Sequence, residues 1–539
     1  MTDLTADLIL ACDNIRTMDP RRPSATALAV TGGRVTAVGE RRDIPGWRGR
    51  RTEVIDLGRA TLTPGLTDSH LHPALGLEMT AGLDLSGCPD LASVRAALRD
   101  AAQASAPDQW IVGWGLDPNS FGEIPVGSGA VEDVLGGRPA CLTLFDGHSV
   151  LASREALRRA GIDGPRRFGS RSAVVCDERG RPTGHLLEEG AMRLVSSVIP
   201  AEPFAARRDR LAALLRDLAA AGLTGGHVMD LDADALELYA ALDRDGRLPL
   251  RLRLAPWRRP EDDAAAVREL LGWQGRRGRL WSVAAVKLFM DGTIDGGTAW
   301  LHEADCHGQS TAAYWQDPRD YTEAVRVLAR AGVQTATHAI GDAAVRHVLD
   351  TLAAVVPAGS PVRHRIEHIE TLPSDQVPRF AELGVVASMQ PSHATDYTRA
   401  DHSDNWSRRL GAERADRAWR CRDILDAGAV LTLGSDWPIA PFDPRVVMAA
   451  ARLRRPAARP DLAPVAPAQA LTAAQALHGY TVAPAVTAGD GQVSGRIAAG
   501  YRADLTAFAA DPVRTPAQDL PGVAIVLTAV DGVVRYRAD

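Results

Sequence analysis

A repeated pattern governs this chain from about residue 201 onward: a helix, then a glycine, then a short β-rich run. Helical stretches end at Gly222, Gly332, Gly384 and Gly428. A β-rich run follows each glycine directly; after Gly332, for example, it is Val333–Ala339. Glycine closes helices because it adopts the left-handed conformation without steric cost, and a strand that is apolar throughout is buried on both faces. Each copy is therefore the helix-to-strand step of a parallel sheet.

The number of such runs narrows the fold further. Eight strand candidates can be counted, near residues 62–70, 223–229, 250–255, 282–289, 333–338, 363–368, 385–390 and 430–435. Eight strands with intervening helices predict an α/β fold of the (β/α)8 TIM-barrel type. A doubly wound open sheet is the structural alternative.

The two ends of the chain and the segment after the first strand have a different character. Residues 7–56 and 493–537 alternate short strands with turns, which suggests one small β-domain assembled from both termini. The roughly 130 residues before the helix at 204 are too many for a loop and predict an inserted subdomain. The predicted boundaries are 1–59 with 485–539 for the terminal domain, 60–484 for the barrel, and about 76–200 for the insert.

Composition excludes several classes of protein. A net charge of −6 and a pI near 6.2 argue against a nucleic-acid surface. No apolar run approaches the roughly 18 residues of a membrane span, and the N-terminus lacks the features of a secretory signal. The six cysteines contain no CxxC pair, which suits unpaired thiols in a reducing compartment. We therefore expect a cytoplasmic protein that binds neither nucleic acid nor membrane.

Lys287 is the only lysine among 61 basic residues, and it sits in the apolar stretch Val283–Met290. A guanidinium stays charged, whereas a buried amine can lose its proton and become a nucleophile. Lys287 is therefore a candidate for chemistry, either as a Schiff-base amine or as a carbamate formed with CO2, which can bridge two metal ions. The alternative is that an arginine-rich chain kept one lysine by chance.

Residues with metal-ligand chemistry stand at or just beyond the ends of five predicted strands. His70 and His72 end the first strand, and alternate residues of an extended strand point the same way, so both imidazoles can reach one ion. Single residues end the fourth, fifth, sixth and eighth strands: Lys287, His338, His368 and Asp436. In a barrel these strand ends converge on one mouth. Each residue alone has a structural explanation, but together they predict a metal site.

A set of motifs carries a family resemblance. They are PGLTDSHLH (64–72), VKLFMDGT (286–293), THAIGDAAVRHVLD (337–350), RHRIEHIE (363–370), MQPSH (389–393), GSDWPIAPFDP (434–444) and GRIAAGYRADLTAFAADP (495–512). With these motifs the chain resembles the metal-dependent amidohydrolase superfamily, and within it the amidohydrolase family 3 branch that includes N-substituted formamide deformylase. The resemblance extends from about residue 7 to residue 536.

The resemblance implies a distorted (β/α)8 barrel, a β-sandwich built from both termini, and one or two divalent ions, usually zinc. It places His70 and His72 with Asp436 on the more buried ion. Carbamylated Lys287 would bridge to a second ion held by two further histidines, His338 and His368. Asp436 would also act as general base.

The resemblance also implies a hydrolase for a non-peptide C–N bond, an amide or an N-acyl or N-formyl amine, attacked by an ion-activated hydroxide. The partner is then a small amide-type molecule, and a homodimer is left open. The rival interpretations are an isomerase or lyase on the same barrel and a degenerate, non-catalytic scaffold. Segments 292–300 and 150–153 depart from the family pattern, so the substrate does not carry over.

Six further residues are predicted to face the substrate, each with a structural role as its alternative: Trp114, Asp146, His148, Asp291, His393 and Trp437. Trp114, Asp146 and His148 belong to the insert, which we expect to form a lid. Glu367 precedes His368 on its strand and should point the other way, so we interpret it as a residue of the fold.

Overall fold

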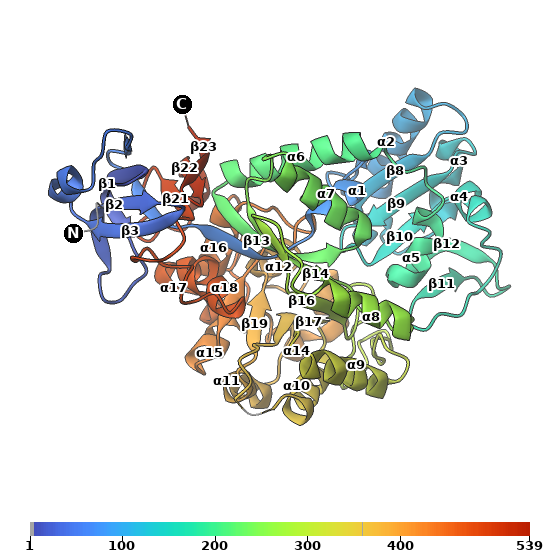
Figure 1. Ribbon diagram of the computed structural model, residues 1–539. Coiled ribbons are helices and arrows are strands. Elements are labelled where there is room, and N and C mark those ends of the chain that lie inside the picture. The colour runs from blue at the N-terminus through green and yellow to red at the C-terminus, as the bar shows by residue number, and fades with distance from the viewer. Residues whose placement is uncertain (1–4, 358, 539) are drawn as a thin grey trace.

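The computed structural model describes residues 5–357 and 359–538, and its centre is an α/β domain (Figure 1). Two parallel sheets form it, with the strand orders β15-β14-β13-β6 and β16-β17-β18-β19-β20. β14 also contacts β16, and β20 contacts β6. The strands are β6 (Leu66–Leu71), β13 (Leu223–Leu231), β14 (Arg251–Pro256), β15 (Trp281–Val283), β16 (Ala285–Phe289), β17 (Gln334–Ala339), β18 (Arg365–His368), β19 (Val386–Met389) and β20 (Leu431–Leu433).

Each of the eight predicted runs overlaps a parallel strand, and the run at 282–289 corresponds to two strands, β15 and β16. The parallel pairing excludes neither a barrel nor an open sheet by itself, but the contact of β20 with β6 brings the first and last strands of the series together. The domain is therefore TIM-barrel-like, as predicted.

Helices cover the outside of these strands because each carries one apolar face. In α6 (Phe204–Ala220), the side chains of Leu211, Leu215 and Leu218 are completely buried. Burying a leucine side chain stabilises the fold by about 1.5–3 kcal/mol. The other covering helices are α7 (Ala233–Arg244), α8 (Ala264–Trp273), α9 (Pro318–Arg330), α10 (Asp342–Val355), α11 (Val377–Leu383), α15 (Cys421–Asp426), α16 (Pro444–Leu453), α17 (Ala473–Tyr480) and α18 (Val482–Thr487).

The predicted glycine stops are confirmed. Gly384 follows α11 with φ of 66°, and Gly332 and Gly428 follow α9 and α15 with φ of 69° and 88°. A side chain at such a position is strained, so glycine ends these helices and lets the next strand start at once.

Strands from both termini join one sheet, in the order β23-β22-β21-β5-β1-β2-β3 with β4 beside β1. The central pairing is antiparallel, between β21 and β5, and Arg16 bonds Asp511 across the two halves at 2.6 Å. Residues 1–4 and 539 of the predicted terminal domain lie outside the described residues. The strands are β1 (Leu8–Arg16), β2 (Ser24–Thr31), β3 (Arg34–Gly39), β4 (Glu53–Asp56), β5 (Thr61–Pro64), β21 (Leu505–Phe508), β22 (Ile525–Val530) and β23 (Val533–Arg537).

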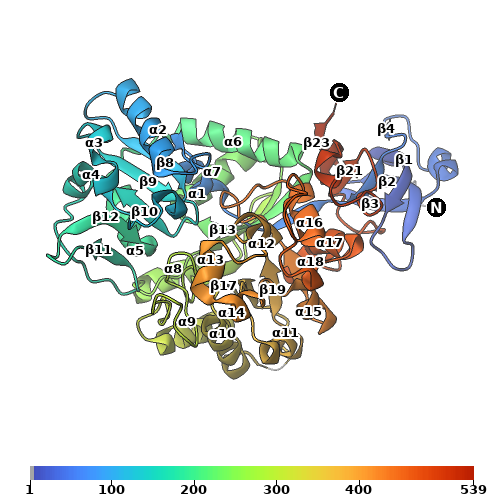
Figure 2. The ribbon, with the colours of Figure 1, turned by 180° about the vertical axis from the view of Figure 1, so that it is seen from behind.

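The long segment after β6 folds around a sheet of its own, in the order β11-β12-β10-β9-β8-β7. In both views it lies on the opposite side of the central domain from the terminal sheet (Figures 1 and 2). Its elements are α1 (Pro73–Met79), β7 (Leu83–Asp84), α2 (Leu91–Ala104), β8 (Ile111–Leu116), α3 (Glu132–Leu135), β9 (Ala140–Leu144), β10 (Ser149–Ala152), α4 (Arg154–Arg159), β11 (Ala173–Cys176), β12 (Pro182–Leu187) and α5 (Glu188–Ser196).

Two features bear on the site. The β9–β10 turn of the insert carries Asp146 and His148 to the central domain, where Thr293 bonds Asp146. Three short helices follow β19: α12 (Pro391–Asp396), α13 (Asn405–Leu410) and α14 (Ala412–Ala415). Within the part of the chain that the structure describes, none of the helices combines the length and the apolar character needed to cross a bilayer.

Candidate metal centre and pocket

The six predicted ligands come together at the C-terminal ends of the central strands, and all are buried: His70, His72, Lys287, His338, His368 and Asp436. Nε2 of His70 lies 3.2 Å from Nε2 of His72 and 3.4 Å from Nζ of Lys287. One Asp436 oxygen lies 3.2 Å from His70 and 3.1 Å from His72. Four potential ligand atoms thus converge on one point.

His338 and His368 form the other half of the cluster. Their ring centroids are 4.4 Å apart, and Nδ1 of His368 lies 3.9 Å from the second oxygen of Asp436. His338 also approaches the carbonyl oxygen of Gly292 at 3.1 Å. His70, His368 and Asp436 each present one ligand atom, and these atoms lie within 4.8 Å of one another. Asp436 therefore stands between the two groups of histidines.

The backbone turns two of these side chains toward the mouth of the strands. His368 and Asp436 have φ of 75° and 60°, in the left-handed region that residues with a side chain rarely adopt. Such strain is concentrated at functional sites and persists where the surroundings hold it in place. At His368 this backbone turns the ring to the mouth, while Glu367, on the other face of the strand, points inside the strands toward His70.

Glu367 consequently has a role that the sequence interpretation missed. Its carboxylate accepts a hydrogen bond from Nδ1 of His70 at 2.6 Å, with both side chains completely buried. A histidine that donates from Nδ1 keeps a lone pair on Nε2, which is the atom that faces Asp436. Glu367 therefore orients a predicted ligand and selects its tautomer.

Arg365 holds Glu367 in place. Its guanidinium contacts the two carboxylate oxygens at 2.5 and 2.8 Å, and it donates to the carbonyl of Ser69 and to Oγ of Ser388, both at 2.6 Å. Burial alone would raise the pKa of Glu367, but the charge of Arg365 and the bond from His70 hold it well below its usual range. The carboxylate beside His70 is therefore ionised at neutral pH.

The donor set fits a divalent ion. Within residues 5–357 and 359–538, Nδ1 of His368 and Nε2 of His393 are buried without a hydrogen-bond partner. Nε2 of His393 lies 3.7 Å from Asp436. Imidazole nitrogens and carboxylate oxygens at this spacing are the ligands that zinc prefers, and an ion would satisfy the unpartnered nitrogen of His368.

Lys287 is buried in this cluster, and its surroundings favour a neutral amine. Burial lowers its pKa, against the charges of Glu367 and Asp436, to about 8. An amine with such a pKa is partly unprotonated at neutral pH, which is the form that reacts with CO2. The electrostatics of the site are thus compatible with a carbamate at this position.

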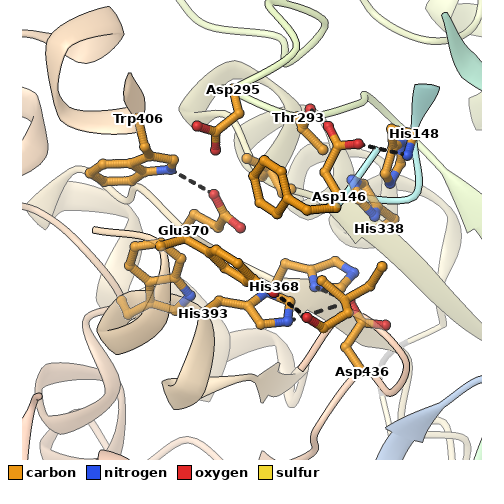
Figure 3. Close-up of a pocket in the computed structure, with 15 residues that line it drawn as sticks. Asp146, His148, Thr293, Asp295, His338, His368, Glu370, His393, Trp406 and Asp436 are labelled. Atoms are coloured by element: carbon orange, nitrogen blue, oxygen red, sulfur yellow. Dashed lines mark hydrogen bonds and ion pairs between the residues drawn. The ribbon is translucent and has the colours of Figure 1, made fainter. Parts of the chain in front are cut away.

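A pocket opens beside the cluster (Figure 3). His338, His368 and Asp436 line its floor. Of the residues predicted to face substrate, the structure brings three to its wall: Asp146, His148 and His393. A small molecule in this space would lie directly against the predicted ligands.

Comparison with known proteins now bears on identity. The sequence profile described as the amidohydrolase family matches residues 53–536. The chain belongs to the amidohydrolase family. It is 29% identical over 549 residues to the N-substituted formamide deformylase of Arthrobacter pascens, which covers 98% of each chain. The resemblance drawn from the motifs is therefore confirmed.

Solved structures share the fold of this amidohydrolase. An uncharacterized metal-dependent hydrolase from Pyrococcus horikoshii OT3 superposes with a TM-score of 0.72 at 23% identity, over 96% of this chain and 99% of the other. The atrazine chlorohydrolase TrzN from Arthrobacter aurescens TC1, in complex with zinc, superposes with a TM-score of 0.54 at 16% identity, over 99% and 97%. These likenesses extend over the terminal sheet and the insert as well as the centre.

Three residues of the amidohydrolase that were predicted to face the substrate are not among those that line this pocket. Asp291 is completely buried, and its carboxylate accepts hydrogen bonds from the backbone N–H groups of Trp300, Ile340 and Gly341 at 2.8–3.0 Å. These bonds join the loops after β16 and β17, so both carboxylate oxygens are directed at backbone amides, and one of them lies 3.9 Å from Nε2 of His338. Trp114 pairs with Asp84 on the sheet of the insert, and Trp437 packs against Phe442.

His148 is held by a second buried acid. Its Nδ1 lies 3.0 Å from Glu188, a residue of α5. Burial alone would lower the pKa of His148, but the charge and hydrogen bond of Glu188 outweigh it and raise the pKa to about 9. The imidazole ring is therefore charged at neutral pH, and its centroid lies 5.0 Å from that of His338.

Several pocket residues escaped the sequence interpretation: Thr293, Asp295, Glu370, Tyr397, Trp406 and Trp419. Glu370 stands two positions after His368, so the RHRIEHIE motif contained a usable signal for it. Trp406 and Trp419 belong to the helical segment after β19. Nothing in the neighbouring sequence distinguishes them from tryptophans of the hydrophobic core. Their place depends on how that segment folds back over the mouth.

Proposed function

We propose that the protein is a metal-dependent hydrolase of a non-peptide C–N bond, in an amide or an N-acyl or N-formyl amine. The observation that carries the proposal is the placement of Asp436 between His70, His72 and His368 at the floor of a pocket. Family membership supports a hydrolase, and the relationship to a formamide deformylase supports this bond type.

In this proposal His70, His72 and Asp436 hold one zinc ion, and Lys287, His338 and His368 hold a second. Neutral Nζ of Lys287 would add to CO2 and release one proton, and the resulting carbamate would give Lys287 an anionic oxygen with which to hold metal. Bound ions supply an acidified water and polarise the scissile carbonyl group.

Asp436 is the general base of the proposed reaction. Burial alone would raise its pKa, but the histidines around it hold the pKa well below its usual range, so it is ionised at neutral pH. It takes a proton from the attacking water and delivers it to the nitrogen that leaves as an amine. Its left-handed backbone aims the carboxylate at the pocket floor.

The finer architecture belongs to the same proposal. The strand series closes as a distorted (β/α)8 barrel, and the terminal sheet forms a β-sandwich domain over 1–59 and 485–539. The insert at about 76–200 forms the lid, because its turn supplies Asp146 and His148 to the pocket wall. A cytoplasmic location and a homodimer also stay predictions.

Metal content of the purified protein, measured by plasma mass spectrometry after growth with zinc and bicarbonate, tests the proposal. One to two equivalents in the wild type, with a loss in Lys287→Ala, is the expected result. A well-folded wild type without metal would contradict it and favour the scaffold. Hydrolysis of N-formyl amines in H2-18O must place label in the acid product, whereas an isomerase or lyase would place none.

A further inference from the structure

The outer wall of the pocket carries three carboxyl groups besides Asp436: Asp146, Asp295 and Glu370 (Figure 3). They come from different parts of the chain: the turn of the insert, the loop after β16, and the segment after β18. The charge of Asp146 acts on Asp295, and that of Asp295 on Glu370, so the three groups share one space.

Each of these carboxyl groups already has a hydrogen-bond donor. Oγ1 of Thr293 donates to Asp146 at 3.0 Å, and Nδ2 of Asn405 donates to Asp295 at 3.0 Å. Nε1 of Trp406 donates to Glu370 at 2.7 Å. Each of the three carboxyl groups therefore already accepts a hydrogen bond from a side chain of the protein.

Their charges, by contrast, are only partly offset: the charge of His148 acts on Asp146, and that of Arg409 acts on Asp295. In the described part of the chain, no lysine or arginine lines the pocket. Nearby Arg409 is paired with Asp305 at 2.8 Å, and the charge of His148 is balanced by Glu188 at 3.0 Å. Burial raises the pKa of Asp295 to about 7, against the bond from Asn405, and the charge of Asp146 adds to the rise. Among the described residues, no lysine or arginine of the wall itself offsets the remaining negative charge.

The remaining wall is aromatic. The rings of Trp406 and Trp419 stack with centroids 5.0 Å apart, and those of Phe145 and Tyr397 lie 4.7 Å apart. Aromatic faces attract cations through their quadrupole, most strongly tryptophan. Trp419 is 1% exposed, and its Nε1 has no hydrogen-bond partner among the described residues. His393, 6% exposed, presents a second unpartnered nitrogen to the same pocket.

We propose that Asp146, Asp295 and Glu370, with the aromatic wall, form a specificity site for a cationic group. Building on the proposed hydrolysis, the substrate is then an N-acyl or N-formyl amine that carries a second, positively charged amino or ammonium group. A polyhydroxylated substrate suits the wall less well, because hydroxyl groups would bring hydrogen bonds where donors already exist and would bring no positive charge to the three carboxyl groups.

Direct binding tests the site without reference to catalysis. The probe is benzyltrimethylammonium, which cannot ligate a metal ion, and benzyl alcohol is its uncharged counterpart; both are titrated into the holoprotein by calorimetry. We expect the cation to bind at least about tenfold more tightly than the alcohol, and to lose about tenfold in affinity in Asp295→Asn. Asparagine keeps an acceptor for Asn405, so the variant removes the charge and not the fold.

Asp401→Asn is the matched control, because Asp401 is an exposed residue of the nearby helical segment and does not line the pocket. Its affinity for the cation should equal that of the wild type. The inference is overturned if benzyl alcohol binds as tightly as the cation, or if Asp295→Asn leaves the affinity for the cation unchanged.

A second arm separates this inference from the proposed function. The N-formyl derivatives of 4-(aminomethyl)benzylamine and 4-(hydroxymethyl)benzylamine are compared as substrates, and kcat/KM should favour the first by about tenfold. Equal hydrolysis of both would overturn the cationic preference while the hydrolase stands. Tight binding of the cation with hydrolysis of neither would support the site and contradict the hydrolase.

Discussion

The ion pair of Glu367 and Arg365 holds His70 of the proposed metal centre in place, and Glu367→Gln tests that role. The substitution keeps the shape of the side chain and an acceptor for His70, but it removes the charge that faces the guanidinium. Both side chains are at most 1% exposed. Arg365 would keep its bonds to Ser69 and Ser388 but would become an uncompensated buried cation.

Two magnitudes follow. Breaking a buried ion pair by removing one partner costs about 3–5 kcal/mol, and the bonds that Arg365 keeps place this variant near 3 kcal/mol. Loss of the carboxylate that orients a metal-binding histidine lowers metal affinity by about 10–100-fold. The first effect belongs to the fold and persists without metal, whereas the second belongs to His70.

The assay therefore measures both quantities separately. Urea unfolding of chelator-treated protein reports the stability, and competition with a chromophoric chelator reports the zinc affinity. Glu382→Gln is the control, because Glu382 is exposed on α11 and the same chemical change there should alter neither quantity. A loss of stability with unchanged zinc affinity would refute the orienting role of Glu367, and unchanged stability would refute the ion-pair argument.

Three further predictions rest on separate contacts. Because the folded pKa of His148 is raised to about 9, its pair with Glu188 stabilises the fold fully below pH 6.5. That contribution, up to about 3 kcal/mol, disappears as pH rises through 9; parallel Tm-versus-pH curves for the wild type and His148→Gln would argue against it. Asp291→Ala should cost about 3 kcal/mol in urea unfolding by leaving three buried amides unpaired, and Asp291→Asn should cost less; equal losses would contradict this. Chelation should lower Tm, and added zinc should restore it. At a 100-fold excess of zinc over Kd, binding should add about 2.7 kcal/mol to the free energy of unfolding; an unchanged Tm would exclude a structural contribution of the ion.

Much of the central domain was predictable because its signals are local. A glycine with a left-handed backbone ends a helix at once, so Gly384 marks both the end of α11 and the approach to β19. The metal cluster was predictable for a topological reason. Parallel strands present their C-terminal ends at one edge, so ligands at five strand ends meet even if loop conformations are unknown.

The sequence interpretation missed the role of Glu367 for an identifiable reason. Strand alternation correctly placed Glu367 and His368 on opposite faces, but Glu367 was interpreted only as a residue of the fold. The left-handed backbone of His368 turns its ring to the mouth and leaves Glu367 inside the strands, beside His70. A single sequence gives no sign of such a turn, because the favourable contacts that hold it come from other strands.

The positions of the parallel strands, the glycine stops and the clustering of six predicted ligand side chains were already contained in residue type and spacing, because hydrophobic period and helix closure act over a few residues. The pairing of Glu367 with Arg365, the diversion of Asp291 to backbone amides and the acidic, aromatic wall of the pocket were decided by the tertiary structure. That wall combines the insert, two strand-end loops and the helices after β19. Burial and charge at such a place depend on segments that meet only when the chain is folded.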